Sequence, residues 1–218
     1  MIDSYDKLTI SKYRQLMNLE KGEDEIAYGV SILSVLSDYS EDELMDMPMD
    51  EFSNLMAKTS FLNKPVEKMD WQHLGKTLTI NGKKYTIIKD AKKMSAAQYI
   101  DYKTYMRKVD EFLDMIPYIL TVFIIPEGCK YADGYDIDEL ANEINNNINI
   151  RTAVCISDFF HHQSTLSMLA SVHYLKWMMK RILKKEKNME ARAKIQNAME
   201  QMELLENSLK NGGGFIQQ

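Results

Sequence analysis

The chain has 218 residues, 45% of them hydrophobic and 27% charged, and its net charge is only −5. This composition excludes wholesale disorder, gives no overall basic field for nucleic acid, and supplies enough apolar material for a core. Two cysteines cannot form a disulfide framework, and nine glycines with four prolines are roughly half the usual share, so we predict a helix-rich protein of a reducing, intracellular setting.

The first 51 residues are acidic, with 13 Asp or Glu against four Lys or Arg. Helical spacing of apolar residues predicts short helices over residues 11–19 and 23–38. Ser40 and Glu43 fit a capping box, and Pro48 suits the first position of a further helix. The side chains expected to point inward are Tyr13, Leu16, Met17, Ile26, Val30, Leu33, Ser37, Phe52, Leu55 and Met56.

Residues 77–80 and 83–88 are β-prone runs joined by Asn81-Gly82, a dipeptide that tolerates positive φ at both central positions of a type I′ turn. We therefore predict a β-hairpin. Because an isolated two-stranded hairpin is marginally stable in water, it should lie against helices or pair with a strand of a neighbouring molecule.

The segment that starts at Ser95 favours helix. Ser95 and Gln98 fit a second capping box, and apolar residues then recur every three or four positions as far as Ile116, which predicts one helix with a coiled-coil-like seam. After Pro117, residues 118–125 are apolar on all sides, so a buried helix and a buried strand both fit, and we favour the helix. The uncharged stretch here is too short to span a bilayer, and the N-terminus has no apolar signal segment, so we expect neither membrane contact nor secretion.

A loop is predicted between Gly128 and Gly134, and Asp136 should cap the helix that follows. No glycine or proline occurs in the 77 residues after Gly134. We therefore predict a very long helix that starts near Ile150, after an asparagine-rich break. Residues 153–183 are apolar on most faces, which is typical of a helix inside a bundle.

The C-terminal part of the chain changes character. Apolar residues at 195–209 alternate by three and four positions among polar ones, a narrow seam for one partner helix in the same chain or another. Residues 211–214 form a flexible, glycine-rich end, and the apolar pair after it fits either a small anchor or a frayed tail. The residues expected to contact protein are Ile195, Met202, Leu205, Leu209, Phe215 and Ile216.

These elements predict a mainly α fold with one β-hairpin (α+β), a helical bundle with a long C-terminal helix and a flexible tail. Three regions are expected. They are an acidic helical region over residues 1–62, a hairpin plus helical core over 63–187, and a coiled-coil-like arm with the glycine-rich tail over 188–218.

No group of residues reaches the pattern of a catalytic or metal site. His161 and His162 are adjacent and point about 100° apart on a helix, and His173 has no acidic residue three or four positions after it. Cys155 lies in an apolar helix, which is typical of an inert buried thiol. The acidic run 133–139 lacks the ligand spacing of an EF-hand, and no phosphate-binding glycine motif is present. We therefore predict no enzyme activity, no metal and no cofactor.

One basic run is a candidate contact surface. Lys176, Lys180, Lys184 and Lys187 share a helix face, and Trp177 lies beside them. A solvated face near a helix end, contact with nucleic acid and contact with an acidic protein surface all fit this pattern, and we favour the solvated face. The acidic N-terminal region of a neighbouring copy offers such a protein surface.

The order of several motifs carries a family resemblance. In chain order they are Glu43-Leu44-Met45-Asp46-Met47-Pro48-Met49-Asp50-Glu51-Phe52, Asn81-Gly82-Lys83-Lys84-Tyr85, Gln98-Tyr99-Ile100-Asp101, Ile124-Ile125-Pro126-Glu127-Gly128, Tyr131-Ala132-Asp133-Gly134-Tyr135-Asp136 and Phe159-Phe160. In this layout the chain resembles small morphogenesis proteins of tailed bacteriophages, particularly the crAss-like phages of gut Bacteroides hosts, and is similar to tail assembly chaperones. The resemblance covers residues 10–180.

The resemblance implies a non-enzymatic structural protein of the phage particle, in the portal or tail region, that acts by protein–protein contacts in an oligomeric assembly. Its partners would be other phage structural proteins and further copies of itself, in the virion or the host cytoplasm. The alternative is a tail assembly chaperone that is absent from the mature particle. The extended C-terminal segment favours a particle component over a compact chaperone. A second alternative is a nucleic-acid-binding protein that uses the basic face of residues 176–187.

Overall fold

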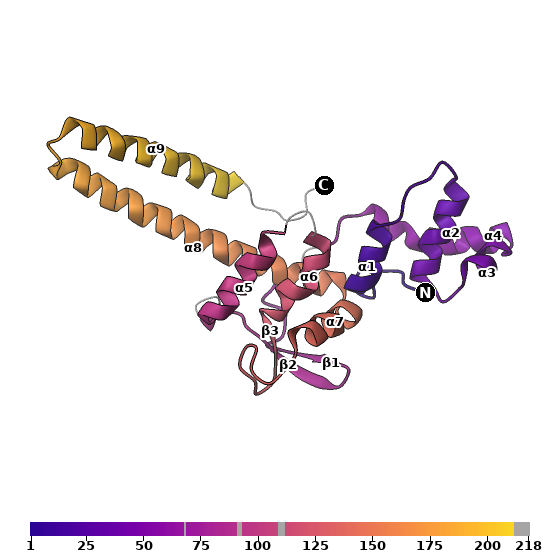
Figure 1. Ribbon diagram of the computed structural model, residues 1–218. Coiled ribbons are helices and arrows are strands. Elements are labelled where there is room, and N and C mark those ends of the chain that lie inside the picture. Colours follow the sequence, from indigo (N-terminus) through magenta and orange to yellow (C-terminus); the bar gives the residue numbers. More distant parts are fainter. Residues whose placement is uncertain (68, 91–92, 109–111, 212–218) are drawn as a thin grey trace. The chain divides into compact units, whose positions relative to one another are not determined.

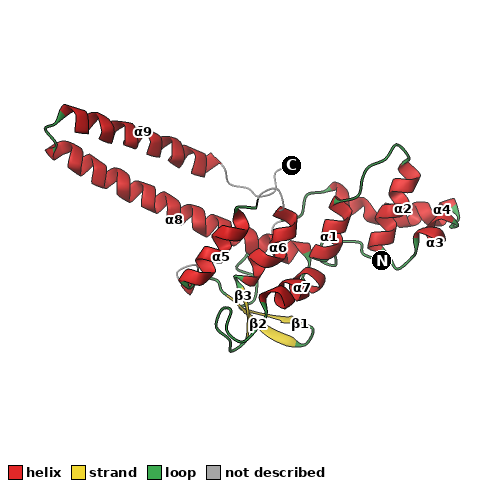
Figure 2. Cartoon of the chain, viewed as in Figure 1, coloured by secondary structure: helices red, strands yellow, loops and turns green. Residues whose placement is uncertain are grey.

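The computed structural model describes residues 1–67, 69–90, 93–108 and 112–211. The chain is mainly helical, with one small antiparallel sheet and a long C-terminal helix (Figure 1) (Figure 2). The predicted fold class is thus confirmed, whereas the predicted tail after residue 211 lies outside the described residues. The chain forms two compact units, Met1–Ser157 and Asp158–Gln218. The three predicted regions, divided after residues 62 and 187, stay predictions.

The N-terminal part of the first unit consists of short helices whose apolar faces meet in a small core. Val30, Leu33, Leu44 and Phe52 are buried in this core. Gly29 allows the helices to approach closely, since a Cβ atom at this position would lie 3.2 Å from the Phe52 ring. The elements are α1 (Ile10–Met17), α2 (Glu25–Leu36), α3 (Glu41–Met45), α4 (Met49–Lys58) and the 3-10 helix η1 (Thr59–Asn63).

Of the two helix starts predicted in this region, the one at Ser40 is confirmed and the one at Pro48 is displaced by one residue. Ser40 and Glu43 form the capping box, in which the Ser40 backbone N–H donates to the Glu43 carboxylate at 2.8 Å. This hydrogen bond lowers the pKa of Glu43, because it stabilises the ionised form. Pro48 lies immediately before α4, one residue earlier than predicted.

The predicted inward positions are partly confirmed. Phe52 is buried, and Leu55 and Met56 pack against the same core. The prediction is wrong for Met17 and Ile26, whose side chains are exposed. Both lie in end turns of their helices, where neighbouring helices no longer cover the apolar stripe.

The predicted hairpin is confirmed as β1 (Thr77–Ile80) and β2 (Lys83–Ile87). Asn81 and Gly82 have φ values of 48° and 77°, as a type I′ turn requires. The hairpin is supported within the chain, because β3 (Ile124–Pro126) pairs antiparallel with β2 and gives the strand order β1-β2-β3.

The hairpin also contacts the helix α7 (Ile137–Asn147) through side chains. Lys83 Nζ lies 2.8 Å from a Glu143 carboxylate oxygen, and the Tyr85 hydroxyl donates to the other oxygen. Burial and the bond to Glu143 raise the pKa of Tyr85. The hairpin therefore packs on a helix of its own chain, which is the first of the two supports predicted for it.

Replacing Gly82 by alanine should destabilise the first unit by about 1 kcal/mol, because an L side chain disfavours positive φ. A Cβ there would meet no atom within 4 Å, so the loss would come from the backbone alone. Urea unfolding measures this difference. The control Asn81→Gly should leave stability within about 0.5 kcal/mol of wild type, since glycine also tolerates positive φ.

The predicted continuous helix up to Ile116 is wrong. The structure has two helices, α5 (Ala96–Met106) and α6 (Phe112–Thr121), and Arg107 is the C-cap of the first. The Ser95–Gln98 capping box is confirmed. Polar residues 107 and 108 end α5 after Met106, and α5 and α6 pack against each other.

The apolar run 118–125 is helix in its first half and strand in its second. The helix α6 contains Pro117 and ends at Thr121, so the helical interpretation is wrong for its last residues. Gln98 explains part of this change, because its side-chain amide donates to the Val122 carbonyl at 2.6 Å inside the protein. That bond satisfies a buried carbonyl where the chain leaves the helix.

The main core of the first unit lies among α5, α6, α7, the sheet and the start of α8 (Ile150–Lys185). Asp136 caps α7 as predicted, with its carboxylate accepting from the backbone N–H groups of Asp138 and Glu139. α8 starts at the predicted residue. The largest fully buried side chains of the unit are Phe123, Leu8, Ile10, Leu33, Leu36, Leu44, Ile119, Leu120, Ile124, Ile144, Ile150 and Ile156.

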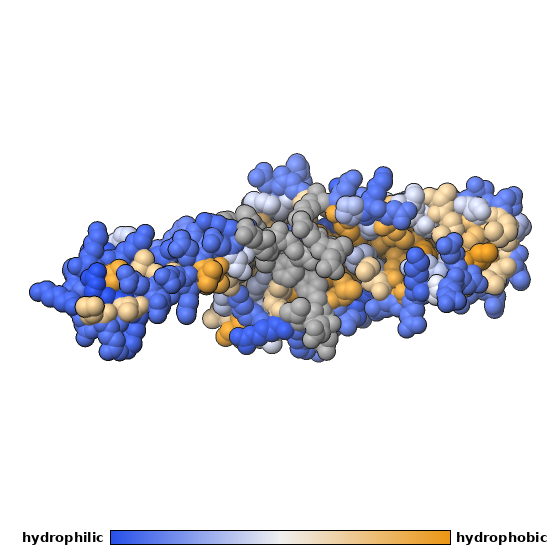
Figure 3. All heavy atoms as spheres, turned by 90° about the horizontal axis from the view of Figure 1, so that it is seen from above, coloured by the Kyte–Doolittle hydropathy of each residue, from blue (hydrophilic) through white to orange (hydrophobic). Residues whose placement is uncertain are grey.

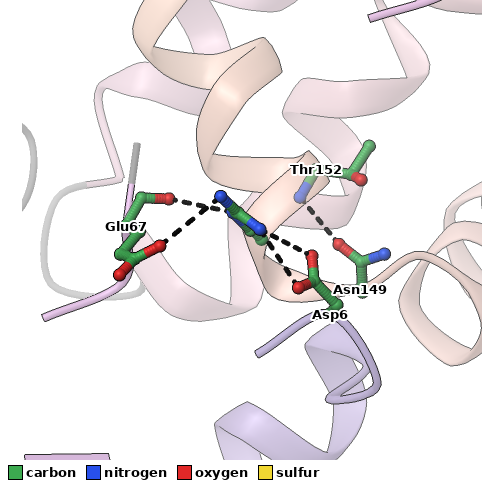
Figure 4. A network of polar contacts seen from close by, with 5 residues as sticks. Asp6, Glu67, Asn149 and Thr152 are labelled. Atoms are coloured by element: carbon green, nitrogen blue, oxygen red, sulfur yellow. Dashed lines mark hydrogen bonds and ion pairs between the residues drawn. The ribbon is translucent and has the colours of Figure 1, made fainter. Parts of the chain in front are cut away.

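A polar network joins the first turn of α8 to two distant segments (Figure 4). The Arg151 guanidinium donates to both carboxylate oxygens of Asp6, each at 3.1 Å, and to the Glu67 carbonyl at 3.3 Å. Asn149 caps the helix by accepting from the Thr152 backbone N–H at 2.8 Å. One guanidinium nitrogen, Nη1, makes both contacts to Asp6, while Nε donates to the Glu67 carbonyl. Arg151 therefore holds both segments on the start of α8 through charge-assisted hydrogen bonds.

Candidate functional site

The second unit is a pair of antiparallel helices, the rest of α8 and α9 (Met189–Asn211) (Figure 1). The turn between them is closed by side chains. Asn188 accepts from the backbone N–H of Glu190 at 2.9 Å, and Arg192 donates to the carbonyls of Leu183 and Glu186, each at 3.0 Å. These bonds satisfy backbone groups that both helix ends leave unpaired, and so they define the turn.

One face of each helix is buried between them. On α8 this face repeats every three or four positions, and Val172 is its buried member. On α9 the predicted seam residues Ile195, Met202 and Leu209 are half-buried, whereas Leu205 is 49% exposed. From residue 165 onward, the described positions of α8 that are partially or fully buried are Thr165, Leu169, Val172, Leu175, Lys176, Met179 and Leu183.

Glu206 takes the place in the seam that was expected for Leu205. It is the buried charged residue of α9, and its carboxylate accepts from Lys176 Nζ at 2.9 Å and lies 3.0 Å from His173 Nε2. Lys210, one turn further along α9, donates to the same carboxylate. The bonds from Lys210, Lys176 and His173 lower the pKa of Glu206, and the bond to Glu206 raises the pKa of Lys176.

Replacing Glu206 by glutamine should remove an acid-sensitive contribution to the helix pair. Because folding lowers the pKa of Glu206, the ionised carboxylate stabilises the helix pair at pH values above 4.5, the ordinary pKa of this group. This stabilisation is lost as the pH falls through the pKa that Glu206 has in the folded chain. The melting temperature of Glu206→Gln should therefore lie below that of wild type near neutral pH and approach it in acid. Thermal melts followed by circular dichroism measure the difference in melting temperature between variant and wild type at both pH values. Glu200→Gln, an exposed change on the same helix, is the control, and an equal pH effect for both variants would contradict the assignment.

The face of α8 that points away from the seam carries exposed aromatic and apolar side chains. Tyr174 is 60% exposed and Trp177 52%, and their ring centroids lie 5.9 Å apart. The Arg181 guanidinium stacks on the Trp177 ring at 4.7 Å. Met178 and Ile182, one turn apart, extend this surface. We call the set Tyr174, Trp177, Met178, Arg181 and Ile182 the α8 outer face.

The prediction that residues 153–183 lie inside a bundle is therefore correct only at the start. Residues 153–156, within the first unit, are buried, but the outer face further along is open to solvent. A pair of helices can cover only one side of each member, so an all-round apolar helix keeps an exposed stripe in this chain.

The predicted basic face is not uniform. Lys176 points into the seam and pairs with Glu206, so it is not part of an open cationic surface. Lys187 follows the end of α8, in the turn. Lys180 and Lys184 are exposed, as are Arg181 and Lys185, and none of these four forms an ion pair within the described residues. The open surface thus combines aromatic side chains with unneutralised positive charge.

A second surface with exposed apolar side chains belongs to the N-terminal helices. Met45 is 64% exposed and Met49 59%. They lie in residues 41–51, which we call the acidic segment because it contains six Asp or Glu and no Lys or Arg. Figure 3 shows hydrophobic atoms on the surface of these helices among hydrophilic ones.

The other sequence candidates do not come together as a site. The described residues contain no group of three His, Cys, Asp or Glu that could hold a metal ion, and no described helix is long and apolar enough to cross a membrane. Cys155 is buried, with its sulfur 3.3 Å from the Met69 carbonyl oxygen, and Cys129 is exposed. The side chains of His161 and His162, and the whole of Phe215 and Ile216, lie outside the described residues.

Comparisons with protein-family models, with curated proteins and with solved structures give no match to this chain. The resemblance to phage morphogenesis proteins thus depends on the order of sequence motifs.

Proposed function

We propose that the protein is a non-enzymatic structural component of a tailed-bacteriophage particle, in the portal or tail region, that acts through protein–protein contacts in an oligomeric assembly. The proposed role in an assembly is supported by the α8 outer face, where the side chains of Tyr174 and Trp177 are more than half exposed. The motif order over residues 10–180 supports the phage part.

The composition of the α8 outer face is that of an interface core. Aromatic residues, Met and Arg are enriched at protein interfaces, and Trp, Tyr and Arg dominate the residues that contribute most to binding. In the free chain Arg181 stacks on the Trp177 ring, and the Tyr174 ring lies beside that of Trp177, with the centroids 5.9 Å apart. Because these contacts restrict the rotamers of the three side chains, less side-chain entropy is lost when a partner binds them.

The rest of the α8–α9 helix pair holds this face in a fixed position. The seam and the Glu206 cluster hold α9 against the opposite side of α8, and Arg192 closes the turn. A helix held on one side presents its other side as a fixed surface, which suits repeated contacts between identical subunits.

Mass spectrometry of purified phage particles that encode this chain tests the proposal. A structural component should be present in many copies per particle. The alternative, a tail assembly chaperone, should be present during assembly and absent from the mature particle, so its absence there would contradict the structural role.

Nucleic-acid binding is a second candidate, favoured by one observation. Lys180, Arg181, Lys184 and Lys185 are exposed around Trp177, an arrangement that suits phosphates and stacked bases. Binding to duplex DNA at low salt, weakening steeply as salt rises, would support this candidate. No binding at low salt would exclude it.

A further inference from the structure

We propose that the α8 outer face of one copy docks on the acidic segment, residues 41–51, of a second copy of the chain. This inference rests on the proposed assembly function and names the partner of that surface. The contact would be heterologous, because the two surfaces differ and every copy carries one of each.

Charge selects this pairing. The outer face carries or adjoins four exposed cations that form no ion pair within the described residues, whereas the acidic segment contains six Asp or Glu and no base; the cations are Lys180, Arg181, Lys184 and Lys185. The cations that surround the outer face are exposed, and so are the six acidic side chains. Opposite charges attract over several ångströms and guide encounter, while pairing two α8 outer faces would place like charges together.

The apolar parts of the two surfaces match as well. Met45 and Met49 are exposed within the acidic segment, four positions apart, with Asp46 and Asp50 directly after them. Methionine sulfur makes favourable contacts with aromatic rings, and the outer face offers Trp177 for them. Both surfaces therefore have an apolar centre beside charged residues, which is the usual anatomy of a protein interface.

The acidic segment is held in a fixed conformation by its own fold. The Ser40–Glu43 capping box sets the start of α3, and Leu44 and Phe52 are buried in the small N-terminal core. Met45 and Met49 are thereby turned outward on ordered backbone. Their exposure is a property of the folded chain and is retained until a partner covers it.

Charge reversal in the full-length chain tests this pairing. Lys180→Glu/Lys184→Glu in one variant and Asp42→Lys/Asp46→Lys in another should each weaken self-association at least about tenfold, measured by light scattering across a concentration series. An equimolar mixture of the two variants should assemble again, because each then meets a surface of opposite charge. Such complementation requires contact between different copies.

The controls separate the possible failures. Lys76→Glu/Lys84→Glu, which reverses two exposed charges elsewhere, should leave the mass unchanged, and circular dichroism confirms that each variant folds. An unchanged mass for either reversal variant, or no complementation, would overturn the inference while leaving assembly intact. A wild-type chain that is monomeric throughout would overturn the proposed function itself. Loss of DNA binding in Lys180→Glu/Lys184→Glu, with assembly unaffected, would assign the face to nucleic acid.

Discussion

Replacing Trp177 by glutamate should weaken self-association of the chain at least about 30-fold. Trp177 is 52% exposed, with the Tyr174 ring beside it and Arg181 stacked on it, so it has the position of a central interface residue. Truncating such residues typically costs about 2 kcal/mol or more of binding free energy, and about 1.4 kcal/mol corresponds to a tenfold change. A glutamate would in addition bring a negative charge to the acidic segment of the partner.

The measurement is the dissociation constant from light scattering or sedimentation of the full-length chain. Met189→Glu is the matched control, because Met189 is the most exposed large apolar residue in the part of the chain that the structure describes and lies in the first turn of α9, where a negative charge is favourable. The control should behave like wild type. Equal association of Trp177→Glu and wild type would show that the α8 outer face is not the contact surface.

Replacing Phe123 by alanine should lower the free energy of unfolding of the first unit by about 3 to 5 kcal/mol. Phe123 is fully buried between α6 and β3, and its ring centroid lies 5.5 Å from that of Tyr102 on α5. Its carbonyl accepts from the Ile88 backbone N–H at 2.8 Å, just beyond the end of β2. The loss would combine lost apolar burial with a cavity among rigid elements.

Urea unfolding, followed by circular dichroism, measures this loss. Ile100→Ala on α5 is the control, because Ile100 is exposed and its truncation should change stability by less than about 0.5 kcal/mol. A loss below about 1 kcal/mol for Phe123→Ala would contradict the position of Phe123 at the centre of the first unit. The helices of the second unit should keep their stability, since the change lies outside Asp158–Gln218.

Signals within a few residues were read correctly from the sequence. The capping boxes at Ser40 and Ser95, the Asn81-Gly82 turn and the start of α8 depend on backbone groups of neighbouring residues. Contacts between residues that are distant in the chain could not be predicted from these local signals. β3 forms because residues 124–126 can pair with β2, some 40 positions earlier, and no local pattern distinguishes such a strand from a buried helix.

In the candidate site, too, the local spacing was predicted correctly and the contacts between distant residues were not. The three-four spacing of Ile195, Met202 and Leu209 predicted a helix seam correctly, but the buried ionic residue at its end, Glu206, had no local signal. Lys176 was grouped with the exposed lysines because its pairing depends on a residue 30 positions away. The exposure of Trp177 could have been inferred from the α8 spacing of 165, 169, 172 and 176, which leaves it outside the buried stripe.

The mass of the full-length chain in solution decides whether copies of the protein associate, and light scattering across a concentration series measures it. We expect a mass of several multiples of 25.4 kDa that falls towards one multiple as salt rises, because opposite charges form the contact. A mass of 25.4 kDa at every concentration and salt would contradict it.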